Sequence, residues 1–372
     1  MKKLGFGFMR LPLVNGEFEN VDREILCRMV DSFIAKGFQY FDTAWFYHSG
    51  QSEAAIKDCL VDRHPRSAFL LADKMPLVLI HREEELEDYF EAQLSRCGVH
   101  YFDYYLIHDM GGDRRQAAEQ MHVFDFIRKK KEQGFVKQMG FSFHDTADVL
   151  DKILTDHPEV DFVQIQLNYL DWESEVIQSR KCCETAERHG KPVIVMEPVK
   201  GGTLARLLPE AETLLRSCNP DMSIASWAIR FAASQENVML VLSGMSSMEQ
   251  LMDNTSYMED FVPLTEKELA TLRQVVDIIN DSIAIPCTGC SYCTLHCPMN
   301  IGIPKYFSLY NTEMQELSSK AWTAQLMLYG HLSKQFGKAS DCIECGQCEE
   351  MCPQHLPIRR WLKVVAHHFE ED

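Results

Sequence analysis

The chain has 372 residues, of which 46% are hydrophobic, and a formal net charge of −18 at pH 7. This length suits one large domain and a smaller one, and the acidic balance disfavours binding to nucleic acid or to anionic membranes. There is no run of 18 apolar residues, so we expect no membrane span, and the N-terminus lacks the apolar core of a signal peptide. We therefore expect a cytoplasmic protein.

Short apolar runs alternate with amphipathic helices through the first 280 residues, a pattern typical of a parallel sheet covered by helices. Seven runs predict strands, at residues 38–42, 68–74, 104–108, 136–142, 162–168, 192–197 and 239–243. A weaker eighth strand is expected around residues 258–262. Seven or eight strand–helix units favour an α/β fold of the closed (β/α)8 type, a TIM barrel, over an open sheet.

The helices between these strands have recognisable ends. One is expected at residues 21–35, with Asn20 as its N-cap and Gly37 just past its end. Two more are expected at residues 84–95 and 121–133. The last of these ends at Gly134.

The two ends of the chain are expected to differ from the barrel units. Residues 6–13 and 16–18 are predicted to form a hairpin that closes the barrel floor. Residues 1–280 are predicted to form the barrel domain, and residues 281–372 a small, partly helical domain with a ferredoxin-like cysteine pattern. We therefore expect two domains.

Polar residues stand where three successive strands end. These are Asp42, Lys74 and His108, and Tyr47 follows Asp42 by five residues. In such a barrel the C-terminal strand ends meet at the mouth, where catalytic residues lie. A tyrosine can protonate the alkoxide that forms when a carbonyl receives hydride, and a neighbouring lysine lowers the pKa of the tyrosine. An aspartate can hold the lysine, and a neutral histidine can orient the carbonyl oxygen, so together the four residues predict a catalytic site.

These residues resemble the aldo/keto reductase family, whose Asp, Tyr, Lys and His tetrad has this chain order. The resemblance covers about residues 3–280 and rests on four segments: Gly5-Phe6-Gly7-Phe8-Met9-Arg10-Leu11-Pro12, Phe41-Asp42-Thr43-Ala44 with Tyr47, Ser52-Glu53, and Asp103-Tyr104-Tyr105-Leu106-Ile107-His108. It implies a TIM barrel that reduces carbonyl groups or oxidises hydroxyl groups with a nicotinamide cofactor.

Three residues match cofactor contacts of that family. The resemblance implies that Gln164 holds the nicotinamide carboxamide, that Ser142 is the serine of the family's Ser-Asn pair, and that Asn254 contacts the adenine. A fourth, Ser243, opens the segment Ser243–Asn254, which in the family binds the 2′-phosphate of NADP. We expect these four residues, together with Met196 and Gln250, to line a cofactor site.

Other positions depart from the family pattern. Phe143 replaces the asparagine that follows the serine, and Met196 replaces the aromatic ring that stacks under the nicotinamide. Gly244 and Gln250 replace the lysine and arginine that bind the 2′-phosphate. Without this pair of cations, phosphate recognition is weak, which favours NADH over NADPH, or the use of neither.

Two cysteine runs near the C-terminus have identical spacing and are each followed by a proline. They are Cys287-x2-Cys290-x2-Cys293-x3-Cys297-Pro298 and Cys342-x2-Cys345-x2-Cys348-x3-Cys352-Pro353. Each matches the bacterial ferredoxin spacing for a [4Fe–4S] cluster, in which the fourth cysteine ligates the other cluster. The expected ligand sets are therefore Cys287, Cys290, Cys293 and Cys352 for one cluster, and Cys342, Cys345, Cys348 and Cys297 for the other. Purely structural clusters, and zinc, are the alternatives.

The segment between the two runs is longer than a small ferredoxin needs. It has 44 residues, from Cys297 to Cys342, and helices are expected at residues 303–310 and 314–329. We therefore expect this insert to be folded rather than to be a simple loop.

The barrel and the clusters together favour an oxidoreductase acting on a small carbonyl or alcohol substrate, with two [4Fe–4S] clusters relaying electrons to a ferredoxin-like carrier. A nicotinamide releases two electrons as hydride, whereas a cluster accepts one at a time, so a flavin is an alternative or additional cofactor. The alternative function is a non-catalytic electron-transfer or redox-sensing subunit that uses the barrel to bind a nucleotide or a partner.

Overall fold

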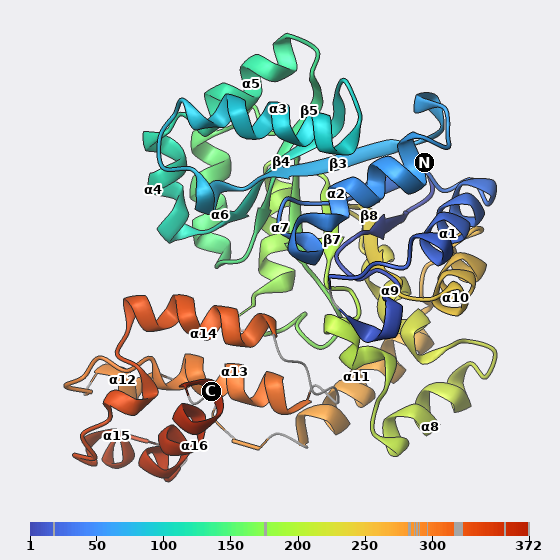
Figure 1. Ribbon diagram of the computed structural model, residues 1–372. Coiled ribbons are helices and arrows are strands. Elements are labelled where there is room, and N and C mark those ends of the chain that lie inside the picture. Colours follow the sequence, from blue (N-terminus) through green and yellow to red (C-terminus); the bar gives the residue numbers. More distant parts are fainter. Residues whose placement is uncertain are drawn as a thin grey trace. The chain divides into compact units, whose positions relative to one another are not determined.

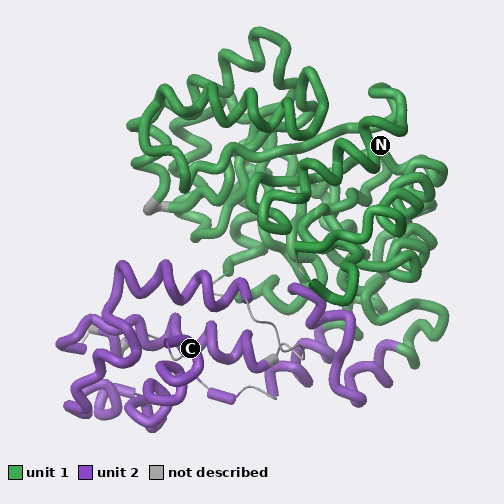
Figure 2. Tube along the Cα trace, in the orientation of Figure 1, with its two compact units in different colours: residues 1–200, 216–272 green, residues 201–215, 273–372 purple. Residues whose placement is uncertain are grey.

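A computed structural model of the chain describes residues 1–17, 19–174, 177–281, 284–285, 287, 289, 291–295, 297–315, 323–352 and 355–370 (Figure 1). The chain divides into two compact units (Figure 2). The first comprises residues 1–200 and 216–272, and the second comprises residues 201–215 and 273–372. The second unit thus includes a segment that precedes the predicted domain 281–372. Within the described ranges, no helix is both long and apolar enough to cross a membrane.

The first unit is a closed barrel of eight parallel strands in the order β1-β2-β3-β4-β5-β6-β7-β8, which confirms the predicted TIM barrel. The strands are β1 (Leu4–Gly7), β2 (Tyr40–Asp42), β3 (Leu70–Met75), β4 (Phe102–Met110), β5 (Val136–Phe143), β6 (Phe162–Gln166), β7 (Val193–Met196) and β8 (Val238–Gly244). Most of their residues are buried, as expected for a parallel sheet that is covered on both faces.

The barrel is closed by the N-terminal segment, so two predictions were wrong. β1 pairs in parallel with β2 and β8, with Leu4 opposite Val241 and Gly5 opposite Tyr40. Residues 258–262 form no strand, because Met258 ends helix α10 and a turn and loop follow. The expected hairpin is reduced to one antiparallel bridge, between Leu13 and Val21. Phe18, at its predicted end, lies outside the described residues.

Glycine at position 5 allows close packing of this strand in the barrel. A Cβ placed there would lie 2.8 Å from Leu242 Cδ2 and 3.0 Å from Tyr40 Cδ1. The first contact is too short and the second is tight, so a larger residue would require these side chains to shift. The short, glycine-containing segment is therefore a barrel strand because of what surrounds it.

Helices surround the barrel (Figure 1). They are α1 (Arg23–Ala35), α2 (Gln51–Ile56), α3 (Glu85–Cys97), α4 (Gly112–Gln120), α5 (Val123–Glu132), α6 (Ala147–Asp156), α7 (Ser179–Arg188), α9 (Ile224–Ala233) and α10 (Met248–Met258). Two more, α8 (Pro209–Cys218) and α11 (Glu266–Asp281), each divide between the two units.

The start of α1 differs from the prediction by two residues. Asp22 is the N-cap, and its carboxylate accepts a hydrogen bond of 3.0 Å from the Ile25 amide. The predicted cap, Asn20, instead accepts a backbone hydrogen bond from Val14 through its carbonyl. Gly37 lies just past the helix end with φ +81°, as predicted.

The barrel interior contains an apolar cluster that determines where the polar residues lie. Its members are Tyr40, Ala72, Leu106, Phe162, Ile194, Leu240 and Leu242. Side chains along a strand alternate between the two faces, so the next inward position is two residues further on. From Tyr40, Ala72 and Leu106 that step leads to Asp42, Lys74 and His108. The same step from Phe162 and Ile194 leads to Gln164 and Met196.

The second unit is helical and contains α12 (Tyr292–Leu295), α13 (Ile303–Gln315), α14 (Ala324–Gln335), α15 (Gln347–Glu350) and α16 (Ile358–Glu370). The predicted helix 303–310 is α13, which continues further to Gln315. Residues 316–322, in the predicted helix 314–329, lie outside the described residues, and α14 occupies the end of that range and continues past it.

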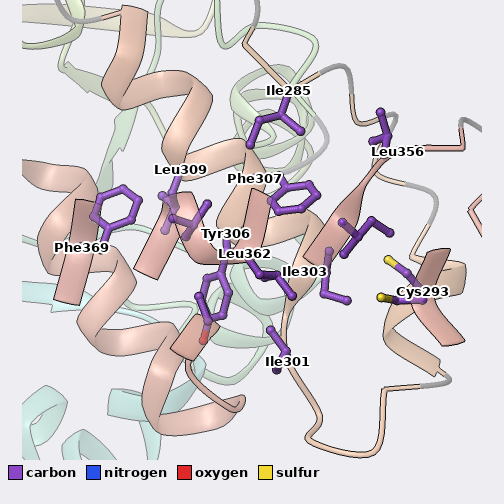
Figure 3. Close-up of a cluster of buried hydrophobic side chains, with 14 of the residues drawn as sticks. Ile285, Cys293, Ile301, Ile303, Tyr306, Phe307, Leu309, Leu356, Leu362 and Phe369 are labelled. Atoms are coloured by element: carbon purple, nitrogen blue, oxygen red, sulfur yellow. The ribbon is translucent and has the colours of Figure 1, made fainter. Parts of the chain in front are cut away.

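An apolar core joins these helices (Figure 3). Tyr329 of α14 stacks on Phe369 of α16 with ring centroids 4.9 Å apart, and its ring is 4.6 Å from that of Tyr306 in α13. Cys293, Cys348 and Cys352 are buried members of the same cluster. The cysteine runs are therefore part of the core of this unit.

Candidate functional site

Lys74 and Asp42 form a buried ion pair at the C-terminal ends of β3 and β2. Lys74 Nζ lies 2.5 Å from Asp42 Oδ1 and donates to the Thr43 carbonyl at 2.8 Å. The side chains are 1% and 4% exposed, so solvent does not screen the pair. The second carboxylate oxygen of Asp42 accepts a hydrogen bond of 3.2 Å from Gln164 Nε2. The lysine is therefore held in one position.

Tyr47 and His108 lie beside this pair and are partly exposed. The Lys74 ammonium is 4.9 Å from the centroid of the Tyr47 ring. The rings of Tyr47 and His108 are 6.0 Å apart and nearly perpendicular, at 85°. Among the described residues, His108 Nδ1 has no hydrogen-bond partner although it is shielded from solvent. The four predicted catalytic residues are thus brought together.

The protonation states follow from burial and from the lysine. Burial raises the pKa of Tyr47, and Lys74 opposes this shift without overcoming it. The tyrosine therefore keeps its proton at neutral pH, although the sequence had suggested a pKa lowered by the lysine. Burial alone would lower the pKa of Lys74, but Asp42 and Tyr47 together raise it. Burial, with Lys74 second, holds the pKa of His108 well below its ordinary value, so this ring is neutral.

A second layer of polar side chains, missed by the sequence analysis, fixes the backbone of Lys74. The Lys74 amide donates to Asp73 Oδ1 at 2.8 Å, and Gln93 Nε2 donates to the Lys74 carbonyl at 3.0 Å. Gln93 also donates to Glu53 at 3.2 Å and accepts from the Tyr105 hydroxyl at 2.5 Å. The available signal was Gln93 itself, a polar residue on the buried face of α3.

The residues matched to cofactor contacts fall into two groups. Ser142, at the end of β5, accepts the Asp109 amide at 2.8 Å, and Met196 ends β7. Together with Gln164 they lie at neighbouring strand ends near the tetrad. Asn254 is instead 5% exposed, donates to Ser243 Oγ at 3.0 Å and accepts from the Tyr257 hydroxyl at 2.7 Å.

The segment that would bind a 2′-phosphate has no cation of its own. Gln250 accepts the Ser246 amide at 2.7 Å and so stabilises its own loop. A Cβ at Gly244 would lie 2.9 Å from Arg10 Cβ, so Arg10 occupies the space of a longer side chain. Nη2 of Arg10 lies 3.9 Å from Oε1 of Glu197, the residue that follows β7. Arg10 is therefore a cation on this rim that the sequence analysis missed.

Four cysteines from both runs line one cavity of the second unit. The cavity is lined by Cys297, Cys342, Cys345 and Cys348, the set that the ferredoxin pattern groups together. Its walls include the apolar side chains of Ile301, Ile303 and Leu362. Among the described residues, no three cysteine, histidine or acidic side chains converge as a single ion would require. Thiolates spaced around an apolar cavity fit a four-iron cluster.

The other predicted ligand set is described in part. Cys293 (Figure 3) and Cys352 are buried in the core of the unit. Cys287 is partly buried and packs against the same core. Cys290 lies outside the described residues. The described members of both sets therefore belong to the same helical unit.

Comparisons with known proteins also separate a barrel portion from a C-terminal cysteine-rich portion. The model of the aldo/keto reductase family matches residues 3–277, and that of the 4Fe-4S dicluster domain matches residues 286–356. The chain therefore belongs to the aldo/keto reductase family, a family of oxidoreductases. It also carries a C-terminal 4Fe-4S dicluster domain.

Individual relatives are distant and match the barrel portion. The uncharacterized oxidoreductase YqkF of Bacillus subtilis is 22% identical over an alignment of 306 residues that covers 73% of this chain and 92% of that protein. The holo form of an aldo-keto reductase from Bacillus halodurans has a TM-score of 0.58 and 22% identity, covering 73% of this chain and 91% of the other. An aldo-keto reductase from Klebsiella pneumoniae in complex with NADPH has a TM-score of 0.58 and 18% identity. The match covers 74% of this chain and 90% of the other.

Proposed function

We propose that the protein interconverts a carbonyl and a hydroxyl group at the barrel mouth, and that two [4Fe–4S] clusters exchange electrons with a carrier. The observation that carries the enzymatic part is the buried Lys74–Asp42 pair beside Tyr47 and His108. A structural ion pair alone would not require a tyrosine and a neutral histidine beside it. The four residues are arranged as an acid catalyst and its supports.

Each residue of the tetrad has a role that follows from its environment. Tyr47 retains its proton and donates it to the substrate oxygen as negative charge develops there. Lys74, kept charged by Asp42, stabilises the phenolate that remains. Neutral His108 hydrogen-bonds the substrate oxygen and orients it. A nicotinamide, when bound, supplies the hydride to the carbonyl carbon.

The pH dependence of reduction tests these protonation states. Reduction needs protonated Tyr47, so activity is lost as pH rises through a pKa raised above about 10. It needs neutral His108, so activity is lost only as pH falls through a pKa below about 6.5. Steady-state kcat/KM is expected to stay level between these limits, with circular dichroism showing that the fold persists. A tenfold fall per pH unit inside this window would contradict the assignment.

We propose that Ser142 and Gln164 bind the nicotinamide end of the coenzyme. We propose NADH as the nicotinamide, because neither Gly244 nor Gln250 offers a cation to a 2′-phosphate. Asn254 uses one N–H for Ser243 and one lone pair for Tyr257, so a second N–H and a second lone pair of its amide are left for an adenine. A flavin is the alternative cofactor, and its absence from acid extracts of fresh protein would exclude it.

Introducing a cation at position 250 tests the coenzyme preference. Gln250→Arg is expected to tighten NADPH binding at least about tenfold, since a charge-assisted hydrogen bond contributes about 1.5–3 kcal/mol. NADH binding should change little, because it lacks the phosphate. Fluorescence titration measures both constants, and Gln133→Arg, an exposed site beyond α5, is the control. An equal gain for both coenzymes in Gln250→Arg would refute a phosphate contact.

The proposed partner is a ferredoxin-like carrier with a basic surface, which the net charge of −18 would attract. The test of the whole function is an anaerobic absorbance spectrum before and after NADH, combined with aldehyde reduction. Turnover with bleaching of the cluster absorbance supports the proposal. Nucleotide binding without turnover would instead support the alternative, a non-catalytic redox-sensing subunit.

A further inference from the structure

One side chain of the cluster cavity has a donor that protein groups leave unused. Arg359, in the first turn of α16, lines the cavity with Cys297, Cys342, Cys345 and Cys348. Its Nη2 donates to Glu349 Oε2 at 2.7 Å, and its Nη1 reaches the Glu344 carbonyl at 3.4 Å. Its Nε is shielded from solvent and has no hydrogen-bond partner among the described residues.

The guanidinium lies against the loop that carries two of the cysteines. A Cβ placed on Gly346 would be 3.9 Å from Cζ and Nη1 of Arg359. Gly346 has φ +84° and stands between Cys345 and Cys348, where the chain turns into α15. Glu349, the partner of Arg359, follows Cys348 directly. The ion pair therefore holds the guanidinium at the cluster-binding loop.

We propose that Arg359 directs its Nε–H and its positive charge at the cluster held by Cys297, Cys342, Cys345 and Cys348, and thereby raises the reduction potential of that cluster above that of the other. This inference rests on the two clusters of the proposed function. One-electron reduction adds one negative charge to a cluster, so a neighbouring cation and an N–H donor stabilise the reduced form. Glu349 offsets part of the charge but leaves the Nε–H donor in place.

The internal repeat shows why only one cluster receives this group. Helices α13 and α16 both begin six residues after the fourth cysteine of their run, at Ile303 and Ile358. The counterpart of Arg359 is therefore Pro304, which has neither charge nor N–H. The next residue, Lys305, places its ammonium 5.4 Å from the centre of the Phe336 ring. At equivalent positions, the half with the second cysteine run thus has an arginine and the half with the first run has a proline.

A redox titration of the full-length, cluster-loaded protein tests the proposal. Electron paramagnetic resonance follows reduction by dithionite with mediators, so the readout needs neither nicotinamide nor substrate. The wild type is expected to reduce in two separate one-electron steps. In Arg359→Met, the step at higher potential should move down while the other stays. The ratio of reduced to oxidised cluster at fixed potential should fall at least tenfold, which corresponds to about 59 mV.

Three further variants distinguish an electrostatic effect of Arg359 on the cluster from a purely structural role of this residue. Arg360→Met removes an adjacent, exposed cation and should shift neither step. Arg359→Lys keeps the charge and Arg359→Gln keeps an N–H donor, so each should produce a smaller shift than Arg359→Met. Iron and sulfide are counted in every sample.

Several outcomes would overturn the inference. These are an unshifted Arg359→Met protein with full iron, equal movement of both steps, or loss of iron in all three Arg359 variants. No iron after anaerobic reconstitution of the wild type would reject both this inference and the cluster part of the proposed function. The predicted shift without carbonyl turnover would reject only the enzymatic part.

Discussion

Tyr47→Phe is expected to lower kcat for carbonyl reduction by about 10²–10⁴-fold, the usual contribution of a positioned general acid. The substitution removes one hydroxyl and keeps the ring that lies 4.9 Å from the Lys74 ammonium. The Lys74–Asp42 pair should therefore remain in place, and KM should change little. Stopped-flow or steady-state consumption of NADH with an aldehyde panel measures the loss.

Tyr104→Phe is the matched control for this prediction. Tyr104 lies on β4, and its ring packs against Tyr40 and Phe162 of the apolar cluster inside the barrel. The control should retain turnover, because its hydroxyl is not part of the tetrad. A correctly folded Tyr47→Phe protein with full turnover would remove Tyr47 from the mechanism and favour the redox-sensing alternative.

Cys348→Ser is expected to remove one of the two clusters, so that iron falls from about eight to about four atoms per chain. Cys348 is 6% exposed and belongs both to the cluster cavity and to the core of the second unit. Because the cavity takes cysteines from both runs, losing the cluster also removes a cross-link between Cys297 and the second run. The free energy of metal binding contributes to folding, so this unit should unfold at a lower temperature.

The control for cluster loss is Cys218→Ser. Cys218 ends α8, is partly exposed, and lies in neither cysteine run. Iron analysis, visible absorbance and calorimetry should match the wild type in this control. Unchanged iron in Cys348→Ser would contradict the predicted ligand set, whereas zinc without iron in the control, with less zinc in Cys348→Ser, would support a structural zinc site.

The sequence by itself determined the features that depend on spacing along the chain. Alternating strands and helices predicted the barrel, and the register of β2, β3 and β4 was regular enough to place Asp42, Lys74 and His108 together. The paired cysteine runs predicted the dicluster domain, which the family comparison confirms. Such patterns are local, because a strand period or a ligand spacing is complete within a few residues.

The tertiary structure alone decided what depends on neighbours distant in the sequence. β1 became the closing strand because β2 and β8 hydrogen-bond to it from both sides, which no window around residues 4–7 could indicate. Burial, rather than the adjacent lysine, set the direction of the Tyr47 pKa. Arg10 beside Gly244, and Arg359 on the cluster cavity, are placed by packing between separate segments. The physical reason is that desolvation and side-chain packing are properties of the folded surroundings, and short stretches of sequence do not contain them.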